Sequence, residues 1–168
     1  MVFQSAIDHD ADLASPSTLC LFENRVNQGM LWEMSVAMVD VFIESFDRAP
    51  EELILDFDST DDAVHGEQVD RFFHGYYDHY CFLPLYVFCG NHLLAAYLRP
   101  SNIDGAKNAW AILSLLVKRF RQVWPRVRII FRGDSGFCRH ITLNWCEMND
   151  ILLSAWPKTA GFWNNRTA

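Results

Sequence analysis

The chain has 168 residues, of which 51% are apolar and 21% charged, and its formal net charge is −7. This much apolar material can form the core of one domain, which excludes an intrinsically disordered chain. The negative charge argues against a protein that simply coats nucleic acid, because binding to phosphates favours a basic surface.

The sequence also limits the compartment. No apolar run approaches the roughly 18 to 20 residues of a membrane helix, and the N-terminal residues carry no basic flank or signal core. We therefore expect a soluble, cytoplasmic protein with no membrane partner. The cysteines are odd in number and form no C-x-x-C pair, which favours reduced core residues over disulfides or a zinc site. They are Cys20, Cys81, Cys89, Cys138 and Cys146.

Two helices are predicted first. Residues 15–27 form a short helix that begins at Ser15-Pro16 or Thr18, and residues 30–46 form a second helix by their apolar spacing. The sequence "RAPEE" ends this helix, and a strand follows over residues 53–59. Two more strands are predicted over 80–90 and 92–100, with a turn around Gly90 and an edge or bulge at Pro84.

Helices and strands alternate in the second half of the sequence. A long helix is predicted over residues 101–125, capped by Ser101 or Asn102 and ended by Pro125. A strand over 127–134, a helix over 137–150 and a strand over 151–156 follow. The predicted core order is β-β-β-α-β-α-β after two N-terminal helices, which indicates an α/β (α+β) fold with a mixed sheet.

Acidic residues gather where two of these strands end. Asp56 and Asp58 share one face of the first strand because side chains alternate along a strand, and Asp134 ends the fourth strand. If these strands are neighbours, their carboxylates converge, and converging oxygen ligands suit Mg²⁺ or Mn²⁺. The alternative is ordinary turn chemistry, in which such aspartates form Asx-turns or helix caps.

Most basic residues lie in the second half of the chain. If the protein binds DNA, we expect it to do so through this half. The candidate DNA-binding residues are Lys118, Arg121, Arg128 and Arg132. The same pattern is equally typical of an ordinary solvated face.

Two long blocks carry a family resemblance. "LDFDSTDDAVHGEQVDRFFHGYYDHYCFLPLYVFCGNHLLAAYLRPSNIDGAKNA" and "WPRVRIIFRGDSGFCR" resemble a bacterial insertion-sequence transposase of the DDE class, over about residues 13–150. The resemblance implies an RNase H-like catalytic domain that cleaves DNA and transfers strands with Mg²⁺ or Mn²⁺. Its implied partners are terminal inverted repeats, target DNA, and a second copy of the chain or a full-length transposase.

The resemblance also implies particular site residues. Asp58 in "DST" matches the first catalytic and metal-binding position, and Asp134 in "RGDSGF" matches the second. Asp56 competes with Asp58 as the first metal ligand. Leu21 stands where the family usually has an arginine, so one DNA contact is expected to be weaker.

The family's third acid has no counterpart. The family takes a glutamate from a later helix in a Tyr-x-x-Arg-x-x-x-Glu setting, which this sequence lacks, and Glu147 falls on the wrong element. We therefore expect a truncated, inactive fragment. Its expected domains are an N-terminal helical segment (1–50), a partial catalytic domain (51–156) and a divergent tail (157–168).

Two alternative functions are open from sequence alone. The fragment could be a non-catalytic DNA-binding or regulatory module that interferes with a full-length transposase. It could instead be an unrelated metal-dependent nuclease, completed by a local acid such as Glu67 or Asp61. For a transposase, the expected location is the bacterial cytoplasm, in association with the nucleoid.

Overall fold

The computed structural model describes residues 15–155, and the chain divides into two compact units, Met1–Met34 and Ser35–Ala168. The first unit contains α1 (Pro16–Glu23) and the beginning of α2 (Gln28–Glu44). The Ser15 hydroxyl caps α1 by accepting a hydrogen bond from the Thr18 amide at 3.3 Å. Pro16 stands in the first turn, so the predicted start of this helix is confirmed.

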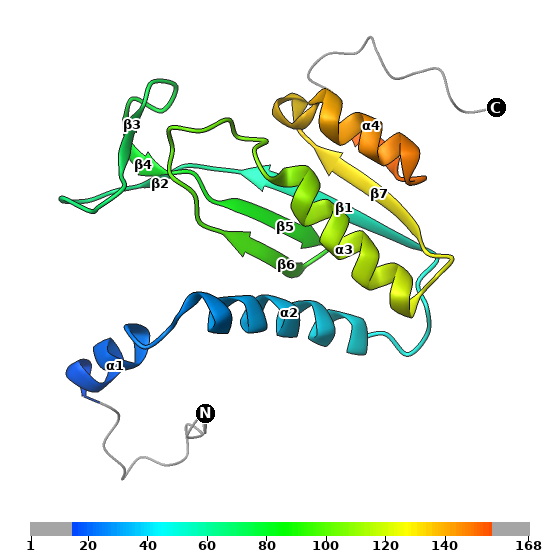
Figure 1. Cartoon of the computed structure of the whole chain (residues 1–168), viewed down its shortest axis with the longest axis horizontal. Coiled ribbons are helices and arrows are strands. Elements are labelled where there is room, and N and C mark those ends of the chain that lie inside the picture. Colours follow the sequence, from blue (N-terminus) through cyan, green and yellow to red (C-terminus); the bar gives the residue numbers. More distant parts are fainter. Residues whose placement is uncertain (1–14, 156–168) are drawn as a thin grey trace. The chain divides into compact units, whose positions relative to one another are not determined.

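The second unit contains a five-stranded mixed sheet (Figure 1). Its strand order is β6-β5-β1-β7-β8, with β1 antiparallel to β5 and parallel to β7. The strands are β1 (Glu52–Ser59), β5 (Leu85–Cys89), β6 (His92–Tyr97), β7 (Arg128–Gly133) and β8 (Leu152–Ala155). Together with the two helices between β6 and β8, this arrangement confirms the predicted core order and the predicted α/β fold class with a mixed sheet.

A second, small sheet follows β1 directly. It contains β2 (Asp62–Ala63), β4 (His79–Phe82) and β3 (Phe72–His74), in that spatial order. The single strand predicted over residues 80–90 is therefore wrong, because β4 and β5 belong to different sheets. Pro84 separates them, since proline cannot donate a hydrogen bond to a strand ladder.

The helix predicted over residues 101–125 is wrong in its first third. Helix α3 spans Ala109–Val123, and residues 101–108 form a loop. Asn108 has a left-handed backbone with φ of 69°, and the carbonyls of Gly105 and Lys107 accept hydrogen bonds from a buried arginine, Arg99. These contacts take up carbonyls that a helix would use internally. The later helix is confirmed as α4 (His140–Met148), after a 3₁₀ turn at Ser135–Phe137.

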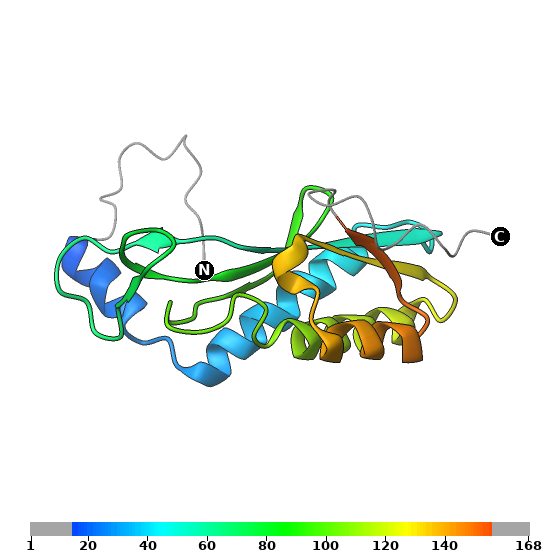
Figure 2. The ribbon, with the colours of Figure 1, turned by 90° about the horizontal axis from the view of Figure 1, so that it is seen from above.

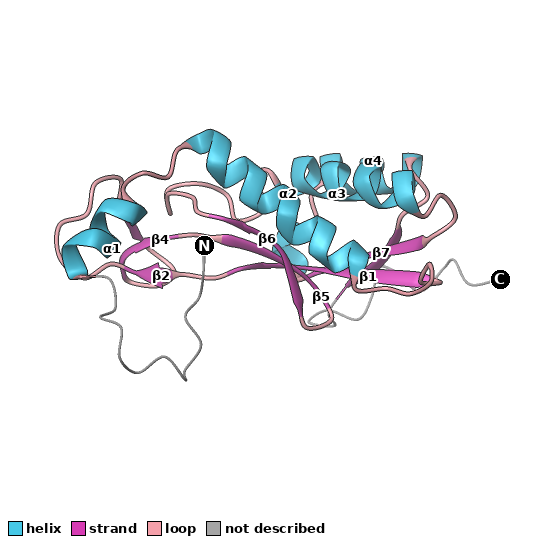
Figure 3. Cartoon of the chain, turned by 90° about the horizontal axis from the view of Figure 1, so that it is seen from below, coloured by secondary structure: helices cyan, strands magenta, loops and turns pink. Residues whose placement is uncertain are grey.

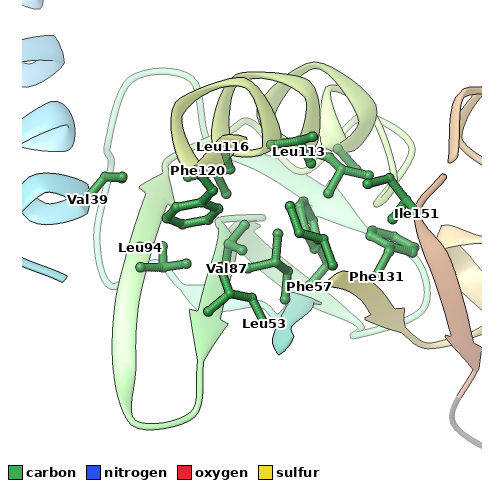
Figure 4. Close-up of a cluster of buried hydrophobic side chains, with 14 of the residues drawn as sticks. Val39, Leu53, Phe57, Val87, Leu94, Leu113, Leu116, Phe120, Phe131 and Ile151 are labelled. Carbon is green, nitrogen blue, oxygen red and sulfur yellow. The ribbon is translucent and has the colours of Figure 1, made fainter. Parts of the chain in front are cut away.

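The helices of the second unit cover one face of the main sheet (Figures 2 and 3). Strand β1 alternates so that its apolar side chains point to this core, where they meet side chains from α3 (Figure 4). The second half of α2 adds Val39, Phe42 and Ile43 to the same core. Other core residues are Leu53, Leu55, Phe57, Val87, Leu94, Leu113, Leu116, Phe120, Phe131 and Ile151.

The cysteines differ in exposure. All are free thiols; Cys81 and Cys146 are buried, whereas Cys20 and Cys138 are exposed. The core prediction is therefore wrong for the last two. Across residues 15–155, no helix has the length and apolar character that a membrane crossing requires.

We expect Leu113→Ala to lower the free energy of unfolding by about 2 to 5 kcal/mol, because it empties fully buried volume beneath α3. Leu115, two residues away on the same helix, is 50% exposed, so Leu115→Ala should cost well under half as much. Urea unfolding followed by circular dichroism measures both variants. Equal losses would contradict the burial pattern.

Cys138 and Cys146 should differ in their reactivity toward a thiol-labelling reagent. Burial raises the pKa of Cys146 to about 12, so this residue stays a protonated thiol at pH 8, and the thiolate is the reactive form. With iodoacetamide at pH 8, Cys138 should react in the native protein and Cys146 only after unfolding in guanidinium. Peptide mass spectrometry reads out both sites, and native labelling of Cys146 at the rate of Cys138 would refute the assignment.

Candidate functional site

The two aspartates of β1 lie on the strand face opposite the core. The side chains of Leu53, Leu55 and Phe57 are buried, so the alternating positions Asp56 and Asp58 point the other way. Asp56 is half-buried, and Asp58 is exposed near the end of the strand. The predicted shared face of these two acids is confirmed.

The register between β1 and β7 relates Asp58 to Asp134. The parallel pairing includes Asp56 with Arg132 and Phe57 with Gly133. The next position along each strand is Asp58 on β1 and Asp134 after β7. Neighbouring strands lie about 4.8 Å apart, so the two aspartates leave adjacent strands at the same edge of the sheet.

The turn after β7 depends on Gly133, the last residue of the strand, and on Gly136 within the turn. A Cβ on Gly133 would approach the Phe137 side chain to 3.2 Å, and a Cβ on Gly136 would approach Oδ1 of Asp134 to 2.8 Å. The missing side chains let the Phe137 ring pack on the backbone and let the Gly136 amide donate to Oδ1 of Asp134 at 2.8 Å. The turn interpretation of Asp134 is thus confirmed.

The turn leaves oxygen atoms available at this edge. Asp134 uses Oδ1 in its turn, so its Oδ2 can still accept a ligand. Asp58 accepts no hydrogen bond from the described residues 15–155. Carboxylate oxygens are ligands that Mg²⁺ and Mn²⁺ prefer, so this donor set fits one hard divalent cation.

Asp56 has a different environment. It forms a two-pronged ion pair with Arg132, the residue opposite it on β7; Nε of Arg132 contacts Oδ1, and Nη2 lies 2.6 Å from Oδ2. The hydrogen bond to Asp56 raises the pKa of Arg132. Both oxygens of Asp56 therefore already contact a cation.

A second cross-strand ion pair lies near the start of the two strands. Arg128 on β7 contacts Oε2 of Glu52 at 2.6 Å, again directly across the register. Two of the predicted DNA-binding residues, Arg128 and Arg132, thus neutralise acids of β1. Opposite charges on directly paired residues stabilise a sheet, which accounts for both arginines structurally.

The other two basic candidates lie on α3. The Arg121 guanidinium donates to the carbonyl oxygen of Asn149 at 2.7 Å, at the end of α4. Lys118 is exposed and forms no ion pair within residues 15–155. Arg121 thus ties α4 to α3, and Lys118 alone of the four candidates presents its full charge to solvent.

Arg99 is the most buried charged residue in the described part of the chain, with 2% of its surface exposed. It donates four hydrogen bonds, of 2.7 to 3.0 Å, to three backbone carbonyls and the Ser59 hydroxyl. The carbonyls belong to Leu83, Gly105 and Lys107. Burial lowers the pKa of Arg99, and the hydrogen bonds offset the cost of burying its charge.

A neighbouring ion pair connects the loop before α3 to the loop before α4. Nε and Nη2 of Arg139 donate to Oδ2 of Asp104 at 3.1 and 2.8 Å, and Oδ1 of Asp104 accepts from the Ala106 amide at 2.8 Å. The pKa of Asp104 is lowered, first by the Ala106 amide and then by Arg139.

The local acids of the nuclease alternative, Asp61 and Glu67, lie in the segments before and after β2. Asp61 lies 2.8 Å from Nε2 of His79 without the alignment of a hydrogen bond. Tyr77 lies nearby; burial, then Asp61 and more weakly Asp58, raise its pKa. Glu67 is 94% exposed and 3.8 Å from Arg71. Within residues 15–155 there is no group of three or more His, Cys, Asp or Glu side chains suited to one metal ion.

Sequence reasoning missed the polar network around Arg99. The local signal was "LRPSNIDG", in which an arginine precedes a proline and several loop-forming residues. Its connection to Ser59 spans 40 residues and appears only in the folded chain. Glu147 lies exposed on α4, the helix after the Asp134 turn.

Residues 1–154 match the model of the family described as transposase DDE domain group 1. No curated protein sequence matches the chain significantly.

Two solved structures are similar at low identity. The crystal structure of the catalytic domain of Mos1 mariner transposase is 11% identical with a TM-score of 0.46, covering 76% of this chain and 61% of that one. The Mos1 transposase paired-end complex with left transposon end is 12% identical with a TM-score of 0.40, covering 76% of this chain and 42% of that one. The chain thus spans less than two thirds of either protein.

The match to the family model covers nearly the whole chain, and it includes both "LDFDST" and "RGDSGF". The chain belongs to the family of DDE transposase domains.

Proposed function

We propose that this domain takes part in metal-dependent cleavage and strand transfer of DNA, with Asp58 and Asp134 as its catalytic metal ligands. The observation that carries the proposal is the β1–β7 register, in which Asp58 and Asp134 directly follow the last pair, Phe57 with Gly133. Family membership supports a transposase-type function for the domain.

Mg²⁺ or Mn²⁺ is the proposed cofactor. When bound in such sites, divalent ions activate the attacking water or 3′-hydroxyl and stabilise the leaving oxygen. Asp58 and Oδ2 of Asp134 would hold the ion, and the Gly136 amide keeps the Asp134 carboxylate in one orientation. Asp56 is the weaker candidate, because a cation bound there would have to displace Arg132.

The proposed partners are the terminal inverted repeats of an insertion sequence, its target DNA, and a second copy of the chain or a full-length transposase. Lys118 is the preferred DNA contact, because its charge is exposed. Arg121, Arg128 and Arg132 remain secondary proposals, since DNA would have to compete with their present partners. Action at the bacterial nucleoid belongs to the same proposal.

The domain proposal assigns residues 51–156 to a partial catalytic domain and residues 1–50 to an N-terminal helical segment. The second half of α2 packs into the core of the sheet unit, which adds Val39, Phe42 and Ile43 to the residues that a test fragment must retain. The proposed tail, 157–168, lies outside the described residues.

Mn²⁺ binding tests the two ligands directly. Asp58→Asn and Asp134→Asn should each weaken binding at least about tenfold, because each removes a charged oxygen ligand. Asp62→Asn is the matched control, since it removes an equal charge from an exposed acid of β2. Electron paramagnetic resonance of free Mn²⁺ gives the affinities.

Asp56→Asn completes this series. If the ion binds Asp56 instead, that variant weakens binding and Asp58→Asn does not. Equal affinity in all four variants and the wild type would refute a metal site at this edge.

We expect the 168-residue chain alone not to cut DNA. Two carboxylates supply fewer charge-stabilising contacts than the three acids of the family pattern. Each lost contact of this kind typically costs about 3 to 4 kcal/mol, or 10² to 10³ in rate. The assay is nicking of supercoiled and end-containing DNA with Mg²⁺ and Mn²⁺, alongside Asp58→Ala and Asp134→Ala.

Robust cleavage that both substitutions abolish would show that a local acid completes the site, and would overturn this expectation. A gel shift against terminal inverted repeats accompanies the assay. Binding without cleavage is the behaviour of a regulatory module that competes with a full-length transposase.

A further inference from the structure

We propose that Arg99 is a positioning residue that, together with the Asp104–Arg139 pair, holds the turn carrying Asp134 in place relative to Asp58. This inference rests on the proposed function, because it assumes that these two aspartates share a divalent cation. It concerns residues that do not themselves touch the ion.

Within residues 15–155, the Asp134 turn lies beyond the last paired residues of the sheet. The pairing of β7 with β1 ends at Gly133, and so does its pairing with the described part of β8. Asp58, in contrast, is still paired with Tyr86 of β5. The position of Asp134 relative to Asp58 therefore depends on contacts made beyond the ladder.

Two kinds of contact lie beyond it. Phe137 packs against Phe57, with ring centroids 6.2 Å apart, and this apolar contact is non-directional. The polar contacts are directional and form a continuous network across the loop before α3. They begin at Ser59, next to Asp58, and end at Arg139, which is five residues after Asp134.

Arg99 is the centre of this polar network. Its Nη2 donates to Ser59, while its Nη1 holds the carbonyls on both sides of Ala106. The Ala106 amide in turn binds Asp104, and Asp104 binds Arg139. The hydrogen bonds between the end of β1 and the start of α4 are thus all 3.1 Å or shorter, and the backbone on either side of Ala106 connects them.

The residues of this hydrogen-bond network should contribute unequally to the position of Asp134. Arg99 is buried with four hydrogen bonds, and charged hydrogen bonds in a buried site are strong. Arg139 and Asp104 are 48% and 49% exposed, and exposed pairs contribute little. We therefore expect Arg99 variants to weaken Mn²⁺ binding more than Arg139 variants.

The experiment measures Mn²⁺ affinity and thermal stability of the 168-residue chain in matched variants. Arg99→Lys should weaken Mn²⁺ binding about tenfold, as supporting contacts of metal ligands typically do. Ser59→Ala and Arg139→Gln each remove one link and should weaken it about threefold. Arg139→Lys should recover part of that loss.

Two controls break equivalent contacts elsewhere. Arg119→Gln removes an ion pair of the same geometry, from α3 to Asp40 at 2.7 and 3.0 Å. Ser114→Ala removes a similar half-buried hydroxyl bond within α3. Both should leave Mn²⁺ affinity unchanged.

The direction of the change in Mn²⁺ affinity distinguishes a positioning role from a purely electrostatic one. Replacing Arg139 by glutamine removes a positive charge, which by itself would strengthen cation binding. A weaker affinity can then only come from displaced ligands. A merely structural role predicts lower melting temperatures with the same affinity as the controls, and that result would overturn the inference.

The inference and the proposed function can fail separately. If Asp58→Asn and Asp134→Asn do not weaken Mn²⁺ binding, the proposed metal site is wrong. If they do, but Ser59→Ala and Arg139→Gln bind Mn²⁺ as tightly as Ser114→Ala and Arg119→Gln, only the positioning role is wrong. Ser59→Ala decides the matter if Arg99→Lys does not fold.

Discussion

The parallel pairing of β1 with β7 is the constraint on which the proposed site depends. It pairs residues that are 76 positions apart in sequence, and its register sets Asp58 and Asp134 at the same edge of the sheet. A shift of one residue would turn Asp58 to the core face, because side chains alternate along a strand. Leu53, Leu55 and Phe57 prevent such a shift, since it would expose them. Burial of apolar side chains therefore fixes the position of charged ones.

The same register explains why neighbouring acids differ. Asp56 and Asp58 share a face, yet Asp56 lies opposite Arg132 and is neutralised, whereas Asp58 lies at the level where β7 ends. The positive charge of Arg132 would also repel a metal cation from Asp56. In our proposal Asp56 is therefore a structural carboxylate, and Asp58, two residues away, is a metal ligand.

The sequence predicted features that depend on local or periodic signals. Side-chain alternation predicted that Asp56 and Asp58 share one face of β1, and helical spacing predicted α3 beyond Ala109. The position of Asp134 at a strand end indicated an Asx-turn or a helix cap. The errors arose where long-range contacts override local preference. Residues 101–108 look like a helix start, but Arg99 takes their carbonyls; Pro84 looks like a bulge, but it separates two sheets. The Asp56–Arg132 pair and the Arg99 network required knowledge of strand order, which no local pattern supplies.

Anomalous diffraction from crystals of the 168-residue chain soaked in Mn²⁺ tests the central claim most directly. The account predicts a manganese peak at about 2.2 Å from oxygens of both Asp58 and Asp134, with the Asp56–Arg132 pair intact beside it. A peak on Asp56 with Arg132 displaced, or an ion bound by Asp61 and not by Asp134, would contradict it.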